Sequence, residues 1–218
     1  MYKIETLQFL KNLKENNNKN WFDAHKNEYD AAREDHLQFT SKLIAAIAKW
    51  EEDVKKLQAK DCVFRIYRDV RFSKDKTPYK SHFGIYISPG GKKSPKAGYY
   101  FHLEPGNAFL GGGMWEPEPA QLKAIRQEID YNLDEFEDVL NQPGFKKYFN
   151  GLDGSKLQKA PKDYPANHPG IEYLKYKDFT VIYYFDDALL TSDKLIKVCT
   201  EAFAAMQPLN DFLNRTLE

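Results

Sequence analysis

Apolar residues recur at helical spacing along the N-terminal part of the chain. Residues 7–13 carry leucine at every third position, and a polar, asparagine-rich run follows at residues 16–20. From residue 22 to residue 50, apolar side chains again recur every three or four positions. This is the period of an amphipathic helix, so the sequence predicts a short helix followed by a long one, or by two with a kink.

The period changes to two after Lys60. Apolar and polar side chains alternate between residues 63 and 72, which predicts a strand. The face expected to be buried contains one charged residue, and its members are Phe64, Ile66, Arg68, Val70 and Phe72. A buried guanidinium cannot lose its proton, so Arg68 would need a carbonyl or carboxylate partner. The candidates are the acidic residues of the segment 116–138, and Asp69 and Asp75 from neighbouring turns.

Further short alternating segments follow. Residues 83–87, 99–103 and 107–111 continue the pattern and predict an antiparallel meander, and residues 179–185 predict one more strand. Helical spacing returns after the meander, in segments separated by a long loop at residues 151–170. The chain is therefore expected to form a single α+β domain over residues 1–218. Its antiparallel sheet would have four to six strands, with one face packed on the N-terminal and C-terminal helices.

Composition limits the class of protein. The 32 basic and 32 acidic side chains of the 218-residue chain give a formal net charge of zero, so no global attraction to nucleic acid or membrane is expected. The longest apolar run, at residues 43–48, is far shorter than the roughly 20 residues that cross a bilayer. No signal-peptide pattern opens the chain. Cys62 and Cys199 form no C-x-x-C pair, so we expect buried thiols and a cytoplasmic protein.

Charge is unevenly distributed along the chain. Residues 61–100 contain nine basic and three acidic side chains, a local excess of +6. Residues 116–138 contain eight acidic and two basic side chains, a local excess of −6. Either the basic segment binds an anion, or the two segments neutralise each other inside the protein.

Chemically versatile side chains gather on the sheet face that the helices would leave open. Alternation places on it Arg65, Tyr67, Asp69, Arg71, His82, Tyr86, Tyr100, His102 and Glu104. Arginines on one face can bind an anion through paired hydrogen bonds, and aromatic rings between cations can stack on bases or sugars. The alternative is a solvated face, or one covered by the acidic segment.

Two other patterns carry less chemical information. The glycine triplet at residues 111–113 lies between a predicted strand and a predicted helix, but Glu116 and Glu118 would repel a phosphate there. We therefore expect the glycines to allow positive φ or a close backbone approach. His82, His102 and Glu104 are a donor set that metal sites use. The strand register that would unite them is not readable from the sequence, and cations surround them, so we expect neither a metal ion nor another cofactor.

The run at residues 68–80, RDVRFSKDKTPYK, resembles the signature of a widespread bacterial and fungal family of conserved hypothetical proteins, a domain of unknown function. The resemblance extends to Trp21–Phe22 with His25 and Tyr29, to the turn at residues 112–115, and to the loop at residues 156–169. It implies a single α+β domain with a site around the signature.

The leading hypothesis is a binding surface for an anionic or phosphorylated ligand, either a small molecule or a nucleic acid. Its expected ligand-binding residues are Arg65, Arg68, Arg71, Lys80, His82, Tyr86, Trp115, Lys156 and His168, the last two on a loop that would close over the ligand. One alternative is an enzyme acting on a phosphorylated or nucleotide-like substrate, with His82 or His102 as acid and base. The other is a scaffold that binds a partner protein. The oligomeric state is left open.

Overall fold

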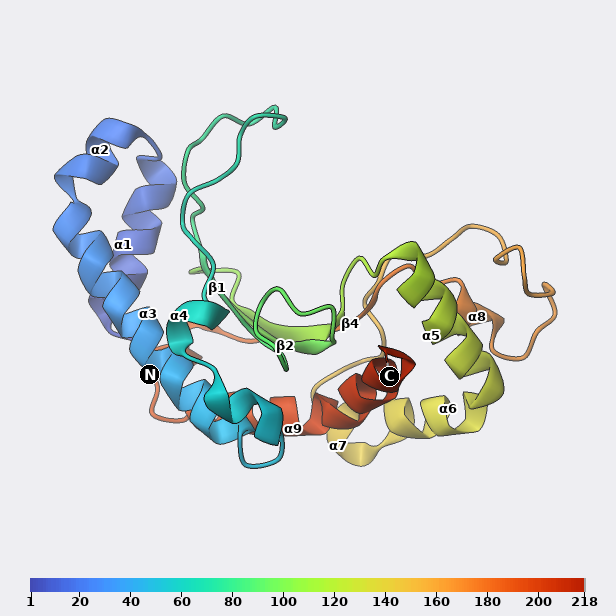
Figure 1. The fold of residues 1–218 in the computed structure, drawn as a ribbon. Coiled ribbons are helices and arrows are strands. Elements are labelled where there is room, and N and C mark those ends of the chain that lie inside the picture. Colours follow the sequence, from blue (N-terminus) through green and yellow to red (C-terminus); the bar gives the residue numbers. More distant parts are fainter. Residues whose placement is uncertain (218) are drawn as a thin grey trace.

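Helices form the N-terminal part of the protein. The computed structural model describes residues 1–217, and the polar run at residues 16–20 contains the turn between its first two helices. The predicted succession of a short and a long helix is confirmed. The helical segments before the sheet are α1 (Ile4–Glu15), α2 (Lys19–Ala24), α3 (Lys26–Ile47), the 3₁₀ turn η1 (Glu52–Lys56) and α4 (Ala59–Cys62) (Figure 1).

The sheet has four antiparallel strands, which are neighbours in the order in which they occur in the chain. They are β1 (Phe83–Ile87), β2 (Gly98–Leu103), β3 (Phe109–Met114) and β4 (Phe179–Tyr184). In the register, His102 lies opposite Gly84 on β1 and opposite Phe109 on β3. The predicted α+β class and antiparallel sheet are therefore confirmed.

The C-terminal half adds further helices around β4. Figure 1 shows α9 and α3 on one side of the sheet, with α5, α6 and α8 grouped at the end of the molecule away from α1. No helix among residues 1–217 is long and apolar enough to cross a membrane. The segments are α5 (Pro119–Tyr131), α6 (Leu133–Asn141), α7 (Pro143–Lys146), α8 (Ile171–Leu174), η2 (Asp187–Leu189), α9 (Leu195–Asn214) and η3 (Arg215–Leu217).

Alternate residues of each strand form the core against α3 and α9. Ile85, Phe101 and Leu110 lie in one row across the sheet, and all three are fully buried. The glycine triplet lies inside β3, not between a strand and a helix as predicted. A Cβ on Gly112 would overlap the Met206 sulfur of α9, so this glycine allows the helix to approach the sheet, as expected from its type.

The strand predicted at residues 63–72 is not formed, and the proposed faces are wrong. Only two isolated bridges occur there, Val63 with Ile85 and Tyr67 with Tyr79. The bridged positions are four apart in residue number on one side and six apart on the other, so the hydrogen-bond ladder is broken between them. Phe72, assigned to the core, is 96% exposed. We call residues 64–80 the arm; Figure 1 shows it extending from the sheet beside α2.

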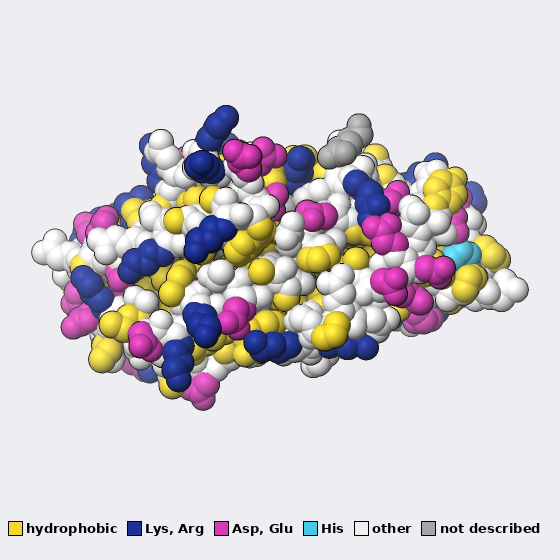
Figure 2. Space-filling model, turned by 90° about the horizontal axis from the view of Figure 1, so that it is seen from below, with side chains coloured by type: hydrophobic (Ala, Val, Ile, Leu, Met, Phe, Trp, Pro, Cys, Tyr) yellow, Lys and Arg dark blue, Asp and Glu magenta, His cyan; other side chains and the backbone are white. Residues whose placement is uncertain are grey.

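The basic and acidic segments do not neutralise each other through ion pairs. Among the ion pairs of residues 1–217, none joins a basic side chain of residues 61–100 to an acidic one of residues 116–138. Figure 2 shows the molecule from below, from the side of α9. Both signs of charge occur on this face, and Asp and Glu side chains are present toward both ends of the molecule.

Candidate functional site

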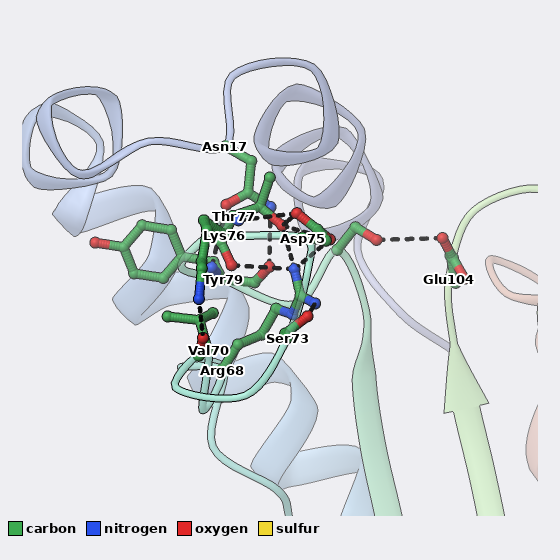
Figure 3. Close-up of polar contacts among 10 residues, drawn as sticks. Asn17, Arg68, Val70, Ser73, Asp75, Lys76, Thr77, Tyr79 and Glu104 are labelled. Carbon is green, nitrogen blue, oxygen red and sulfur yellow. Dashed lines mark hydrogen bonds and ion pairs between the residues drawn. The ribbon is translucent and has the colours of Figure 1, made fainter.

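Arg68 organises the tip of the arm. Its guanidinium donates hydrogen bonds to the Asp75 carboxylate, to the hydroxyl of Thr77 and, at 3.1 Å, to the carbonyl of Thr77. Lys76 adds a hydrogen bond of 2.9 Å from its ammonium to the carbonyl of Val70. Figure 3 shows these side chains pointing inward and closing the loop. Of the carboxylates proposed as partners of Arg68, Asp75 is the one that binds it, and the pair lies at the arm tip and not in the apolar core.

Arg71 is also engaged locally. Its guanidinium binds both carboxylate oxygens of Asp69, at 2.9 Å and 2.6 Å, and these hydrogen bonds lower the pKa of Asp69. Both side chains are largely exposed at the end of the arm. Arg68 and Arg71, which the sequence placed among the ligand-binding residues, therefore direct their donors to the arm itself.

The base of the arm is fixed to the turn between α1 and α2. The ring of Tyr79 stacks on Phe22, with centroids 4.0 Å apart and planes inclined by 14°. Asn17 also binds the backbone of Tyr79 through both of its side-chain polar atoms. These contacts connect the signature run to Trp21–Phe22, two parts of the sequence that the family resemblance singled out.

Aromatic rings cover much of the sheet face opposite α9. We define the aromatic layer as Phe64, Tyr100, His102, Phe109 and Tyr184. His102 stacks on Phe109 with centroids 4.6 Å apart, and Tyr184 follows 5.4 Å beyond Phe109. Phe64, from the base of the arm, meets Tyr100 edge to face at 6.3 Å. Among the described residues no helix covers this layer in Figure 1, and Phe64 and Tyr184 remain 38% and 61% exposed.

A cluster of two imidazoles and a carboxylate borders the aromatic layer. We define the His/Glu cluster as His82, His102 and Glu104, one nitrogen or oxygen atom of each lying within 4.8 Å of the others. Nε2 of His102 is 3.3 Å from Glu104 Oε2, and the rings of His82 and His102 have centroids 4.3 Å apart. The strand register explains the cluster. Gly84 pairs with His102 in an antiparallel ladder, so His82, two positions before Gly84, lies beside Glu104, two positions after His102.

Glu104 is held from several sides. Lys14 of α1 binds its Oε1 at 3.0 Å, and the Ser81 hydroxyl donates to the same oxygen at 3.3 Å. The Asn107 amide donates to Oε2 at 3.3 Å. None of Lys14, Ser81 and Asn107 was foreseen as a site residue. Lys14 lies 90 positions from Glu104 in the chain, and no local pattern signals such a contact.

Burial sets the protonation states of the His/Glu cluster. It lowers the pKa of His82 to about 4, with the His102 charge acting in the same direction. It also lowers the pKa of His102, against the opposing hydrogen bond to Glu104. Burial alone would raise the pKa of Glu104, but hydrogen bonds from Lys14, His102 and Asn107 outweigh it and lower this pKa to about 2. At neutral pH the cluster contains two neutral imidazoles and an ionised carboxylate.

Two cations without a carboxylate partner lie at the root of the arm. Lys80 extends over the ring of Phe64, with its nitrogen 5.4 Å from the centroid. Burial lowers the pKa of Lys80, and the charge of Arg65 lowers it further. In the ion pairs found over residues 1–217, neither Lys80 nor Arg65 takes part. The charge of Lys80 also acts on His82, which places these side chains beside the His/Glu cluster.

Three of the predicted ligand-binding residues, Trp115, Lys156 and His168, lie away from the His/Glu cluster. Trp115 follows the end of β3 that is remote from His102, because His102 pairs with Phe109 at the start of that strand. Lys156 binds Glu172 at 3.3 Å, and His168 binds Asp130 at 2.8 Å. Figure 1 places the loop at residues 151–170 beside α5 and α8, at the other end from the arm.

Tyr86 shares the face of the aromatic layer, but its hydroxyl is engaged. It donates a hydrogen bond of 2.8 Å to the carbonyl of Lys96, in the loop between β1 and β2. Burial raises the pKa of Tyr86 to about 12. Of the nine predicted ligand-binding residues, Lys80 and His82 lie at the His/Glu cluster and Arg65 acts electrostatically on Lys80.

The fold and the site define the class of protein. It is an α+β domain with a four-stranded antiparallel sheet, one face of which carries aromatic rings and, among the described residues, no helix. A family model described as "Conserved hypothetical protein (DUF2461)" matches residues 5–212, so the chain belongs to this family. The family resemblance seen in the sequence is thereby confirmed. No curated protein and no solved structure matches the chain.

Proposed function

We propose that the protein binds a small anionic ligand on the aromatic layer, next to Lys80 and Arg65. The observation that carries this proposal is the pair of cations without a counter-ion. Two like charges that act on each other raise the free energy of the folded protein, and partial burial of Lys80 adds to this cost. An anion that contacts both side chains would offset the repulsion and the burial together.

The surroundings of the two cations suggest what else the ligand contains. The ring of Phe64 lies next to Lys80 and meets Tyr100 edge to face, and the exposed ring of Tyr184 belongs to the same layer. Planar groups stack on such rings with about 1–3 kcal/mol per contact in nucleic-acid complexes. A phosphorylated or nucleotide-like molecule combines the anionic group with the planar one, and this class of ligand fits the face best.

Calorimetric titration with inorganic pyrophosphate and with ATP, at low salt, tests the proposal. Lys80→Met keeps the apolar stem and removes the charge, and it should weaken binding by about tenfold or more, equivalent to about 1.4 kcal/mol. Lys74→Met is the matched control, because Lys74 is exposed at the arm tip and makes no polar contact with another residue among those described. Equal affinity of both variants and the wild type, or no binding to the wild type, would contradict the proposal.

An enzyme acting on the same ligand is the second candidate, because the His/Glu cluster borders the cations. His82 would act as the general base in its neutral form, since burial lowers its pKa to about 4. A phosphate-release assay with ATP distinguishes this function from binding alone. If the protein is an enzyme, His82→Gln should lose turnover and keep its affinity for the nucleotide. If His82→Gln keeps both, the function is binding alone.

A further inference from the structure

We infer that His82, His102 and Glu104 form a binding site for a divalent transition-metal ion. The sequence argued against such a site because the strand register was unknown. The register places the three side chains at one edge of the aromatic layer, with a donor atom of each within 4.8 Å of the others. Two imidazoles and one carboxylate are a donor set used for zinc and for non-haem iron, manganese and nickel.

The spacing of two donors already fits an ion. Nε2 of His102 and Oε2 of Glu104 are 3.3 Å apart, longer than the roughly 2.7–2.9 Å of a charge-assisted hydrogen bond. Ligands bound at about 2.0–2.1 Å in a tetrahedral site lie about 3.3–3.4 Å from each other. The pair is therefore separated like two neighbouring ligands of a zinc ion, and a nitrogen of His82 lies within 4.8 Å of both.

The groups behind the donors orient them as in metal sites. The Tyr100 hydroxyl lies 3.0 Å from Nδ1 of His102. With an ion bound, it can accept a hydrogen bond from Nδ1–H, so that the lone pair of Nε2 binds the ion in place of the hydrogen bond from Nε2 to Glu104. The parallel ring of Phe109 fixes the plane of the same imidazole. Lys14 binds Oε1 of Glu104, which leaves Oε2 as the oxygen that faces His102.

The positive charges of Lys14 and Lys80 oppose the binding of a metal cation. Lys14 shares Glu104 through the other oxygen, so an ion on Oε2 need not displace it. Three protein donors leave a fourth position open for water or an anionic ligand, as in catalytic rather than structural zinc sites. His82 is only partly buried, so solvent reaches this edge of the cluster. The inference is independent of the proposed anion binding, because its test uses the metal ion alone.

Titration of the metal-free protein with Co²⁺ or Zn²⁺ at neutral pH tests the inference. One equivalent should bind, and Co²⁺ should give the visible absorption of a low-symmetry site. His82→Phe keeps an aromatic ring at this position and removes both ring nitrogens. Glu104→Gln removes the negative charge of the carboxylate. Each should weaken binding by more than about 100-fold, whereas Tyr100→Phe should weaken it by roughly 10–100-fold, as an outer partner does.

His25→Phe is the matched control, because His25 stacks on Trp21 away from the cluster. Circular dichroism of the metal-free variants checks that they fold. Stoichiometric binding that persists unchanged in both His82→Phe and Glu104→Gln, or that is lost in His25→Phe, would overturn the inference. So would the absence of stoichiometric binding to the folded wild type.

Discussion

The side chain of Asn17 pairs with the backbone of Tyr79 as a neighbouring strand would. Its amide nitrogen donates to the Tyr79 carbonyl at 2.9 Å, and its amide oxygen accepts from the Tyr79 N–H at 3.1 Å. Residues 17 and 79 lie 62 positions apart, so this side chain joins the helical part of the protein to the arm, beside the stacking of Tyr79 on Phe22. The arm root, which carries Lys80, takes its position from this contact.

Asn17→Ala should therefore loosen the arm. Loss of two hydrogen bonds to a partly buried backbone predicts a decrease of about 1–3 kcal/mol in the free energy of unfolding. Compared with the wild type, amide exchange should become faster in residues 66–80 and stay unchanged in β2 and β3. Asn20→Ala is the control, because Asn20 is exposed in α2 and no side-chain hydrogen bond of it is found. Urea unfolding and hydrogen-exchange mass spectrometry measure both effects, and equal behaviour of the two variants would contradict the prediction.

Arg68→Ala tests whether the arm tip is a structural unit. The guanidinium holds Asp75 and Thr77 together, so its removal should release the tip. We expect faster exchange at residues 70–78 and little change in the global unfolding transition, because Asp75 is mostly exposed and the core does not contain Arg68. Arg71→Ala, which breaks a fully surface-exposed pair, serves as the comparison. A large global destabilisation by Arg68→Ala would show that the pair supports the core.

Gly112→Ala should destabilise the contact between β3 and α9. A Cβ at this position would overlap the Met206 sulfur and the Gly98 carbonyl, so either the helix or the strand must shift. Overpacking of this kind costs about 1–3 kcal/mol. Gly144→Ala is the control, because nothing lies within 4 Å of a Cβ built there. Thermal unfolding compares the two, and the prediction fails if Gly112→Ala melts at the temperature of the wild type.

His36 should make the protein less stable in mild acid. Its imidazole is buried beside the Tyr2 hydroxyl, and burial lowers its pKa to about 4, against 6.5 in the unfolded chain. Between these values the unfolded chain binds the proton and the folded protein does not, so stability falls as the pH decreases from 6.5 toward 4. The loss at pH 4.5 is about 2–3 kcal/mol relative to pH 7. Urea unfolding at both pH values should show a smaller difference in His36→Gln; an equal difference would exclude this titration.

The packing predicts a single cooperative unfolding transition. Buried side chains from α1, α3, the sheet and α9 form one continuous core, for example Leu10, Phe39, Phe101 and Phe203. The C-terminal helices join this core, since Phe136 of α6 packs on Phe212 of α9. Differential scanning calorimetry checks this, and two resolved transitions would indicate two domains.

Periodicity predicted the parts of the fold whose structure depends on neighbouring positions. The stripe of α3 is buried as expected, with Phe39, Leu43 and Ile47 nearly inaccessible, because a helix satisfies its own backbone. A strand needs a neighbouring backbone to pair with, and the alternation of apolar and polar residues does not show whether such a neighbour exists. Residues 63–72 alternate like a strand, yet the bridged positions are four apart on this segment (63 and 67) and six apart on the opposing one (79 and 85), so the arm forms in place of a ladder.

The candidate site shows the same division between local and distant information. His82, His102 and Glu104 were placed on one face by alternation, and they do share it. Their contact depends on the register of β1 against β2, which the sequence left open. Glu104 binds Lys14 of α1, and the arm is anchored by Asn17 in the turn after α1; both lie far away in the chain. Such contacts arise from tertiary packing alone.

The order of the strands has a consequence for synthesis on the ribosome. β1, β2 and β3 follow one another closely, but β4 pairs with β3 only after residues 115–178 have been made. Until then the edge of β3 presents unpaired backbone groups over Phe109–Met114, a segment of glycine and apolar residues without charge. Unprotected edges of this kind pair with other chains. Nascent chains that stall before β4, and proteins truncated near residue 170, should therefore aggregate through β3, and a charged residue at Phe109 should reduce this aggregation.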